Sequence, residues 1–114
     1  MVVGERRFLG ELEQMVLAAC LRLGDDAYGV RIIQEIEAAT GRAVSGGSLY
    51  VTLNRLEDKR LLESRLGAPE PGRGGRPKRY VRVTQPGVAA LQEAREAMLG
   101  LWNGIEERLE RGRP

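Results

Sequence analysis

The feature that most limits the fold of this sequence is a pair of short alternating segments inside an otherwise helical pattern. Leu62–Leu66 and Arg79–Val83 each alternate apolar with polar side chains, which is typical of strands with one buried face. Between them lies Gly67–Pro77, a segment rich in glycine and proline. Turn residues between two alternating segments predict a β-hairpin with a long tip, in which Tyr80 is expected to pack.

Helical patterns lie on both sides of this hairpin. Apolar residues recur at three- and four-residue steps over 9–23, from Asp25 or Asp26 to about Thr40, and over 46–59. A longer pattern of the same kind covers about 85–110. The expected caps and stops are Asp25 or Asp26, Ser45 and Thr84 at helix starts, Pro86 in a first turn, and Gly24 and Gly41 at helix ends. The first three helices are too short to be stable alone, but together they can enclose one small core.

The length and composition indicate one domain. With 114 residues, a second independent core would be hard to stabilise. No segment approaches the roughly 20 apolar residues of a membrane span, so no membrane partner is expected. The first residues lack an apolar run followed by a small-residue cleavage site, and Cys20 has no cysteine partner for a disulfide. We therefore expect a cytoplasmic chain in which Cys20 is a small core residue.

Positive charge is concentrated in the expected hairpin. The whole chain has a formal net charge of only +2. Residues 67–83, however, hold Arg73, Arg76, Lys78, Arg79 and Arg82 against Glu70 alone. A local concentration of charge attracts phosphates in a way that the net charge does not show. The basic tip from Gly72 to Arg79 could therefore enter a narrow anionic groove of DNA, although a solubilising loop would have a similar composition.

The outer face of the helix expected over 46–59 is a second candidate for contact with DNA. Leu49, Leu53 and Leu56 form its buried side. The opposite face carries Gly47, Ser48, Val51, Asn54 and Arg55, with Tyr50 on the flank. In a major groove, Arg55 could donate to guanine or to a phosphate, Asn54 could donate to adenine, and Val51 could contact a thymine methyl group. Any solvated helix face is polar, so this face alone does not decide the function.

The order of these elements predicts a winged helix-turn-helix, a mainly α fold with a small β-hairpin. In that fold the third helix lies in the major groove, and the hairpin reaches the backbone or the adjacent minor groove. We expect a DNA-binding domain over 1–84. A long C-terminal dimerisation helix over 85–114 is expected to belong to the same compact unit. The expected partner is double-stranded DNA.

Several segments together resemble the PadR-like family of bacterial transcriptional regulators, in its smaller subclass with a single C-terminal helix. The matching segments are Leu9–Gln14, Ala27–Val30, Ser48–Tyr50, Leu53–Glu57, Gly75–Tyr80 and Val83–Gly87. Each is weak alone, but their combination and order are specific. In place of the family's frequent Gly-Leu or Gly-Ile pair after the third helix, this sequence has Arg60-Leu61. That difference leaves the geometry of the turn at Arg60 open.

The resemblance implies a repressor that is dimeric through its C-terminal helix. The residues that it implies in contact with DNA are Ser48, Tyr50 and Arg55 on the third helix, and Arg73, Arg76 and Lys78 in the wing. An apolar stripe on the last expected helix consists of Leu91, Met98, Trp102, Ile105 and Leu109. Because a domain of this size cannot cover such a stripe, a homodimer interface is expected there. The stripe could also line a pocket for a small aromatic effector, which Met98 and Trp102 would suit.

The sequence argues against catalysis. It contains no histidine, the commonest general base and metal ligand, and Cys20 has no partner for a metal site or a catalytic dyad. No enzyme activity, cofactor or metal is expected. The main hypothesis is a sequence-specific DNA-binding repressor. The alternative is a small-molecule sensor or protein-interaction module in which DNA binding is secondary.

Overall fold

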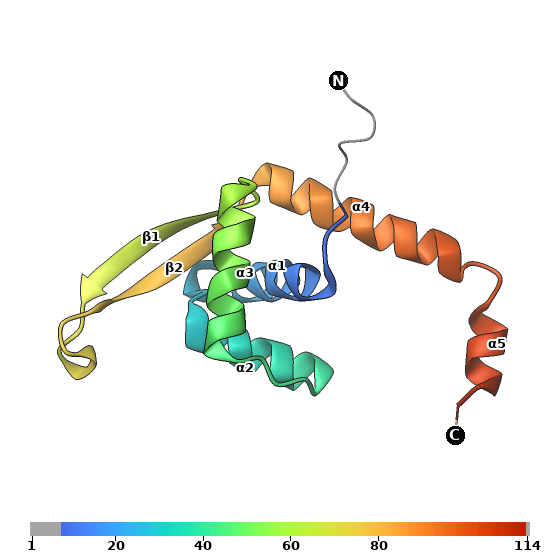
Figure 1. The fold of residues 1–114 in the computed structure, drawn as a ribbon, viewed down its shortest axis with the longest axis horizontal. Coiled ribbons are helices and arrows are strands. Elements are labelled where there is room, and N and C mark those ends of the chain that lie inside the picture. Colours follow the sequence, from blue (N-terminus) through green and yellow to red (C-terminus); the bar gives the residue numbers. More distant parts are fainter. Residues whose placement is uncertain (1–7, 114) are drawn as a thin grey trace.

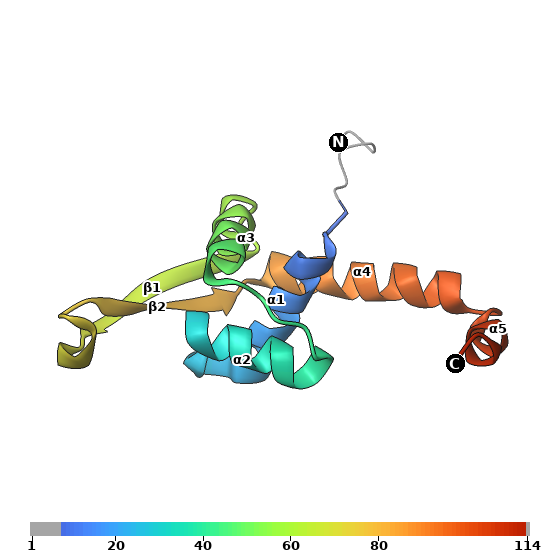
Figure 2. The same cartoon turned by 60° about the horizontal axis from the view of Figure 1, so that its bottom comes forward.

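The computed structural model describes residues 8–113, apart from the side chain of Arg73. In chain order its elements are α1 (Glu11–Leu23), the 3₁₀ turn η2 (Gly24–Asp26), α2 (Gly29–Thr40), α3 (Gly46–Asp58), β1 (Leu62–Pro69), the 3₁₀ turn η3 (Pro71–Arg73), β2 (Pro77–Val83), α4 (Gln85–Trp102) and α5 (Glu106–Arg111). The β1–β2 hairpin projects from one side of the helices, and α4 leads away on the other side (Figures 1 and 2). The predicted order of helices and strands is confirmed up to the start of α4.

The core lies where α1, α2 and α3 meet the root of the hairpin. Its buried apolar side chains are Val16, Leu17, Ala19, Cys20, Ala27, Ile32, Ile36, Leu49, Leu53, Leu56, Leu62 and Val81. The leucine face predicted for α3 is confirmed, because all three of its leucines are buried. Each helix contributes one apolar face to this core, so the opposite face of α3 is left toward solvent.

Local capping signals set the starts of α3 and α4 as predicted. The Ser45 hydroxyl accepts a hydrogen bond from the Ser48 amide at 3.0 Å. The Thr84 hydroxyl accepts one from the Gly87 amide at 3.1 Å. Such caps satisfy amides at a helix start that have no partner within the helix. The register of α3, and with it the outward direction of its polar face, is therefore fixed from its first turn.

The prediction that Asp25 or Asp26 caps α2 is wrong. Both residues lie in η2, and Tyr28 is the N-cap of α2 without a side-chain hydrogen bond. The chain before α2 is held by the hairpin instead, because the amide of Val81 donates to the carbonyl of Ala27 at 2.9 Å. Tyr28 also forms a β-bridge with Tyr80. This long-range pairing keeps the chain extended where the aspartates would have started a helix.

The hairpin is longer than its alternating segments predict. Its strands are antiparallel, with Leu62 opposite Val83 and Leu66 opposite Arg79. After an irregularity, pairing resumes at Pro69 and Pro77, inside the segment predicted to be a loop. Lys78, predicted in the basic tip, lies in β2, as does Arg79, which was predicted where the tip meets the second strand. The tip is reduced to residues 70–76.

The turn after α3 keeps a left-handed residue although no glycine is present. The amide of Arg60 donates to the carbonyl of Glu57, and the amide of Leu61 donates to that of Leu56, both at 2.9 Å. These two bonds form a Schellman motif, in which the first residue after the helix cap is left-handed. Arg60 accordingly has φ = +63°. The Thr84 hydroxyl donates to the Arg60 carbonyl at 2.8 Å, so the turn also contacts the start of α4.

Replacing Arg60 by glycine should raise the free energy of unfolding by roughly 1 kcal/mol. A left-handed conformation costs an ordinary L-residue about 1–2 kcal/mol, and the greater freedom of glycine in the unfolded chain offsets part of the gain. Urea denaturation followed by circular dichroism measures the change. Arg42→Gly is the control, because Arg42 is also an exposed arginine outside the helices but does not have a positive φ. An R60G variant no more stable than the wild type would contradict this account of the turn.

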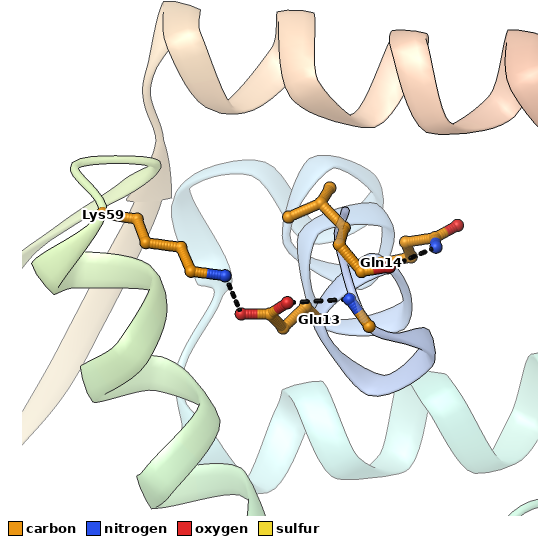
Figure 3. A network of polar contacts seen from close by, with 5 residues as sticks. Glu13, Gln14 and Lys59 are labelled. Carbon is orange, nitrogen blue, oxygen red and sulfur yellow. Dashed lines mark hydrogen bonds and ion pairs between the residues drawn. The ribbon is translucent and has the colours of Figure 1, made fainter. Parts of the chain in front are cut away.

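A buried ion pair joins α1 to the end of α3 (Figure 3). The Lys59 ammonium donates to Glu13 Oε2 at 2.7 Å, and Glu13 Oε1 accepts from the Gly10 amide at 2.8 Å. Glu13 is only 5% exposed. Burial alone would raise the pKa of Glu13, but the hydrogen bonds from Lys59 and Gly10 and the positive charges of Lys59 and Arg55 outweigh it and hold this pKa below its usual value. In the same network Nε2 of the Gln14 side chain donates to the carbonyl of Leu9 at 3.0 Å.

The single helix predicted over about 85–110 is interrupted. α4 ends at Trp102, Gly104 has φ = +91°, and α5 begins at Glu106. Asparagine and glycine are weak helix formers, and a glycine with positive φ cannot continue an α-helix. The predicted continuous stripe is therefore divided among α4, the junction and α5. Its members lie on α4 (Leu91, Met98, Trp102), in the junction (Ile105) and on α5 (Leu109).

Candidate nucleic-acid interface

Four of the predicted contact residues are exposed on the outer side of α3. They are Ser48, Tyr50, Val51 and Arg55. Tyr50 is 61% exposed and Val51 is 53% exposed, although both belong to a helix that is packed on its other side. Side chains on a helix that is fixed by its core are held more precisely than side chains on a loop. This face can therefore meet a groove of DNA without rearrangement of the backbone.

Asn54, the fifth predicted residue of α3, is half-buried and bonded to the hairpin. Arg79 Nη1 donates to Asn54 Oδ1 at 3.0 Å, and Arg79 Nη2 donates to Glu57 Oε1 at 2.5 Å. Glu57 also accepts from the Ser64 hydroxyl at 2.9 Å. The hydrogen bonds from Ser64 and Arg79 hold the pKa of Glu57 below its usual value, although burial opposes this. Both strands of the hairpin are thus attached to the outer side of α3.

Lys78 lies at the start of β2, next to the tip of the hairpin, where it packs on an aromatic ring. Its ammonium is 4.3 Å from the centre of the Tyr28 ring and 3.5 Å from Glu70 Oε2. Desolvation by itself lowers the pKa of Lys78, but its contact with Tyr28 and the charge of Glu70 outweigh it and raise this pKa above its usual value. The Tyr28 ring in turn meets Tyr80 edge-on, with centroids 5.5 Å apart. Lys78 therefore stabilises the join between α2 and β2, a role that its place in a basic run did not predict.

The tip of the hairpin is a compact turn. The amide of Gly75 donates to the carbonyl of Glu70, and the amide of Gly74 donates to that of Pro71, both at 3.1 Å. Arg76 is exposed at the end of this turn. The side chain of Arg73 lies outside the described part of the chain. The backbone of the predicted wing residues Arg73 and Arg76 is therefore presented at the far end of the hairpin (Figure 1).

Arg79 is the site residue whose role the sequence did not reveal. Besides its bonds to α3, its guanidinium is 5.9 Å from the centre of the Tyr50 ring. It borders a groove of about 290 Å³ between α2, α3 and β2. The lining of the groove is mainly apolar, and Lys78 and Arg79 supply its cations. The sequence placed Arg79 at the end of the basic tip and at the start of an alternating segment, and neither pattern predicted a contact with α3.

The C-terminal helices carry an exposed apolar surface. Its large side chains are Val88, Met98, Leu99, Leu101, Trp102, Ile105 and Leu109, each at least 40% exposed. Leu91, predicted with them, instead packs against the core of its own chain. The remaining members of the predicted stripe keep their exposure after the helix is interrupted. An apolar surface of this extent is typical of an interface.

Two kinds of site are absent from residues 8–113. No three carboxylate, cysteine or histidine groups in this part of the chain are clustered as metal ligands would be. Within the same range, no helix combines the length and the apolar character that crossing a membrane requires.

Cys20 is buried as predicted, and burial raises the pKa of its thiol to about 12. A thiol of that pKa is unreactive near neutral pH.

Comparison with known proteins decides the class of this fold. Residues 17–93 match the sequence pattern of the "Transcriptional regulator PadR-like family". The chain belongs to the PadR-like family. The matched range contains α2, α3, the whole hairpin and the first half of α4, so it includes the exposed face of α3 and the basic tip. The family resemblance found in the sequence is confirmed.

Individual known proteins are similar to this chain in sequence or in structure. The transcriptional regulator Rv3488 of Mycobacterium tuberculosis is 39% identical over 74 residues, which are 65% of this chain and 64% of that protein. A PadR family transcriptional regulator from Eggerthella lenta has a TM-score of 0.66 and 28% identity, covering 88% of this chain and 87% of that one. A PadR family regulator from Clostridium difficile has a TM-score of 0.69 over 88% of this chain and 99% of that one, and at 19% identity it shows the fold alone.

Membership of the PadR-like family assigns a general function. The chain is a DNA-binding transcriptional regulator with a winged helix fold. It is not an enzyme, because the family consists of transcriptional regulators.

Proposed function

We propose that this PadR-like regulator is a homodimeric repressor that recognises specific sites in double-stranded DNA. In this proposal residues 1–84 bind DNA and residues 85–114 join two copies. The observation that carries it is the attachment of the basic hairpin to the exposed face of α3 through Arg79, Asn54 and Glu57. Because the two elements are bonded together, they can contact one stretch of DNA as a unit.

We assign base recognition to α3 and backbone contact to the hairpin tip. Arg55 would donate to a guanine edge, and Val51 would meet a thymine methyl group. Ser48 and Tyr50, at the start of the helix, would donate from their hydroxyls to phosphates. In the tip, Arg73 and Arg76 would bind phosphates without regard to sequence. Lys78 contributes less in this proposal than its sequence suggests, because Glu70 and the Tyr28 ring already hold its ammonium.

We assign the exposed apolar surface of α4 and α5 to a second copy of the chain. Met98 and Trp102 are one helical turn apart on α4, and each is 46% exposed. A twofold dimer sets the distance between its two α3 helices, which must be about 34–36 Å to enter successive major grooves. Two half-sites separated by one helical turn are therefore expected in the DNA.

A double variant that carries both Met98→Glu and Ile105→Glu tests dimerisation and DNA binding together. The mass of one chain is 12.6 kDa. We expect light scattering to give twice this mass for the wild type and the mass of a single chain for the variant. Because a monomer contacts only one half-site of the DNA, specific binding by the variant should be abolished in a gel-shift titration. Ala89→Glu with Gly100→Glu is the control, because it adds the same charge at exposed positions on the side of α4 opposite to Met98 and Trp102. A wild-type monomer, or a variant that remains dimeric, would contradict the proposal.

The same interface could also bind a small aromatic effector beside Met98 and Trp102. A ligand there would change how the C-terminal helices cross and so alter the spacing of the two α3 helices. The ligand can shift DNA binding only if it binds the dimer with altered helix crossing more tightly than the DNA-binding dimer. A difference of about 1.4 kcal/mol between these two affinities corresponds to a tenfold loss of DNA affinity. Planar cationic dyes should quench the fluorescence of Trp102, and bound DNA should weaken their binding. Quenching with equal affinity in both states would rule out this coupling.

A further inference from the structure

We infer that Arg79 is a positioning residue that orients the side-chain amide of Asn54 so that it meets DNA only as a hydrogen-bond donor. Asn54 would then recognise an acceptor in the major groove, namely a purine N7, guanine O6 or thymine O4. It would not form the two-bond pair that a free asparagine makes with adenine. This inference rests on the proposed function and adds to it the base chemistry that one position of α3 selects.

The contacts of Arg79 show that its guanidinium is held from several sides. Its side chain is 26% exposed, and its two terminal nitrogens bond to Asn54 Oδ1 and Glu57 Oε1, which lie one helical turn apart on α3. Glu57 is itself held by Ser64 of the opposite strand. Movement of Arg79 away from Asn54 would therefore also break a charge-assisted bond to a carboxylate.

The chemistry of the guanidinium fixes which end of the Asn54 amide faces it. Arginine has five N–H donors and no acceptor, whereas an asparagine amide has an acceptor oxygen and a donor nitrogen. If the amide nitrogen faced Arg79, two donors would meet without an acceptor. The oxygen therefore lies toward the hairpin, and the amide nitrogen is the end left for a partner beyond it. Among residues 8–113, that nitrogen donates to no partner.

Base recognition by asparagine depends on which of its atoms are available. With adenine, asparagine donates to N7 and accepts from the N6 amino group, which requires both ends of the amide. When its oxygen is directed toward Arg79, only the donation remains. Adenine and guanine both present N7, so they are discriminated weakly. Cytosine presents only a donor at its major-groove edge and is rejected.

The test is a selection of binding sites from a random duplex library with four proteins. They are the wild type, Asn54→Ala, Arg79→Met and Arg82→Met. The position read by Asn54 is the one at which Asn54→Ala loses its base preference. There the wild type should accept adenine and guanine similarly and exclude cytosine. Arg79→Met frees the amide oxygen, so the ratio of adenine to guanine at this position should rise by about tenfold. Arg82→Met should leave the preference unchanged, because it removes one arginine–glutamate pair from the same strand without touching α3.

Several results would overturn the inference. One is a strict preference of the wild type for adenine at the position read by Asn54. Another is an Arg79→Met variant with the same base preference as the wild type at that position. A third is that Asn54→Ala changes the base preference at no position of the site. If the wild type selects no sequence at all, the proposed function fails together with this inference. Should Arg79→Met not fold by circular dichroism, Asn54→Asp decides, because aspartate keeps an acceptor for Arg79 but has no donor for DNA. Asn54→Asp should lose the wild-type preference at that position, and retention of the preference would overturn the inference.

Discussion

Replacing Lys59 by methionine should lower the free energy of unfolding by about 3 kcal/mol or more. The substitution keeps most of the aliphatic stem but leaves the carboxylate of Glu13 buried without its partner, at 5% exposure. Loss of one member of a buried ion pair typically costs about 3–5 kcal/mol. The Gly10 amide and the charge of Arg55 still act on Glu13, so the lower end of this range is expected. Urea denaturation at pH 7 measures this cost. The matched control is Arg42→Met, which breaks the exposed pair with Glu11 and should cost less than about 1 kcal/mol.

The pH dependence of the same variant gives an independent check. The pKa of Glu13 in the folded state is below its usual value, so the ion pair contributes its full stability above the unfolded pKa of about 4.3. That contribution is lost as the pH falls through the lower folded-state pKa. The difference between the wild type and Lys59→Met should therefore be constant near neutral pH and shrink under acid conditions. A difference that is small at pH 7, or that grows in acid, would show that the pair does not fix α1 to α3.

Replacing Gly87 by alanine should lower the free energy of unfolding by roughly 3 kcal/mol, near the upper end of the cost of overpacking. A Cβ atom at this position would lie 2.2 Å from the carbonyl oxygen of Leu61 and 2.8 Å from Cγ1 of Val83. The carbonyl cannot simply turn away, because it accepts a hydrogen bond from the Thr84 amide at 3.1 Å. The first turn of α4 would have to move away from the turn that follows α3.

Gly100→Ala is the matched control for this substitution. Gly100 lies in the same helix, and a Cβ atom there would meet nothing within 4 Å. Alanine in place of a helical glycine should raise the free energy of unfolding by about 0.5–1 kcal/mol. Thermal unfolding of the two variants should therefore shift in opposite directions. If Gly87→Ala were as stable as the wild type, the close approach of α4 to Leu61 would not exist in solution.

The parts of the fold that could be predicted from the sequence depend on neighbouring residues. Ser45 and Thr84 cap amides three residues further along the chain, and the leucines of α3 repeat every three or four residues. The alternation of Arg79–Val83 likewise predicts a strand from a short window. Capping and periodicity act over one or two turns, so a local pattern is sufficient evidence for them.

One error arose where a distant segment overrides a local preference. Asp25 and Asp26 have the chemistry of helix caps, but the β-bridge between Tyr28 and Tyr80 delays the helix. The interruption of the last helix had a local signal, the Asn103-Gly104 pair. The apolar stripe continues across that pair, and its periodicity predicted one uninterrupted helix.

The contacts that organise the candidate site are also long-range. Lys59 is 46 residues from Glu13, and Arg79 is 25 residues from Asn54. Neither pairing has a sequence period that could reveal it. The sequence correctly predicted that the outer face of α3, apart from Asn54, and Arg76 in the tip are exposed. It could not predict that Arg79 would join the hairpin to α3 or that Lys78 would pack on Tyr28.

The most direct test of DNA binding through these two surfaces is the salt dependence of affinity on a selected site and on random duplex DNA. We expect Arg73→Ala with Arg76→Ala to weaken binding to both DNAs about equally and to flatten the salt slope by up to about one unit per lost phosphate contact. Arg55→Ala should cost about 1–3 kcal/mol on the selected site and less on random DNA. A wild-type protein whose binding to either DNA is independent of salt, or an Arg55→Ala variant that loses equal affinity for both, would contradict the account.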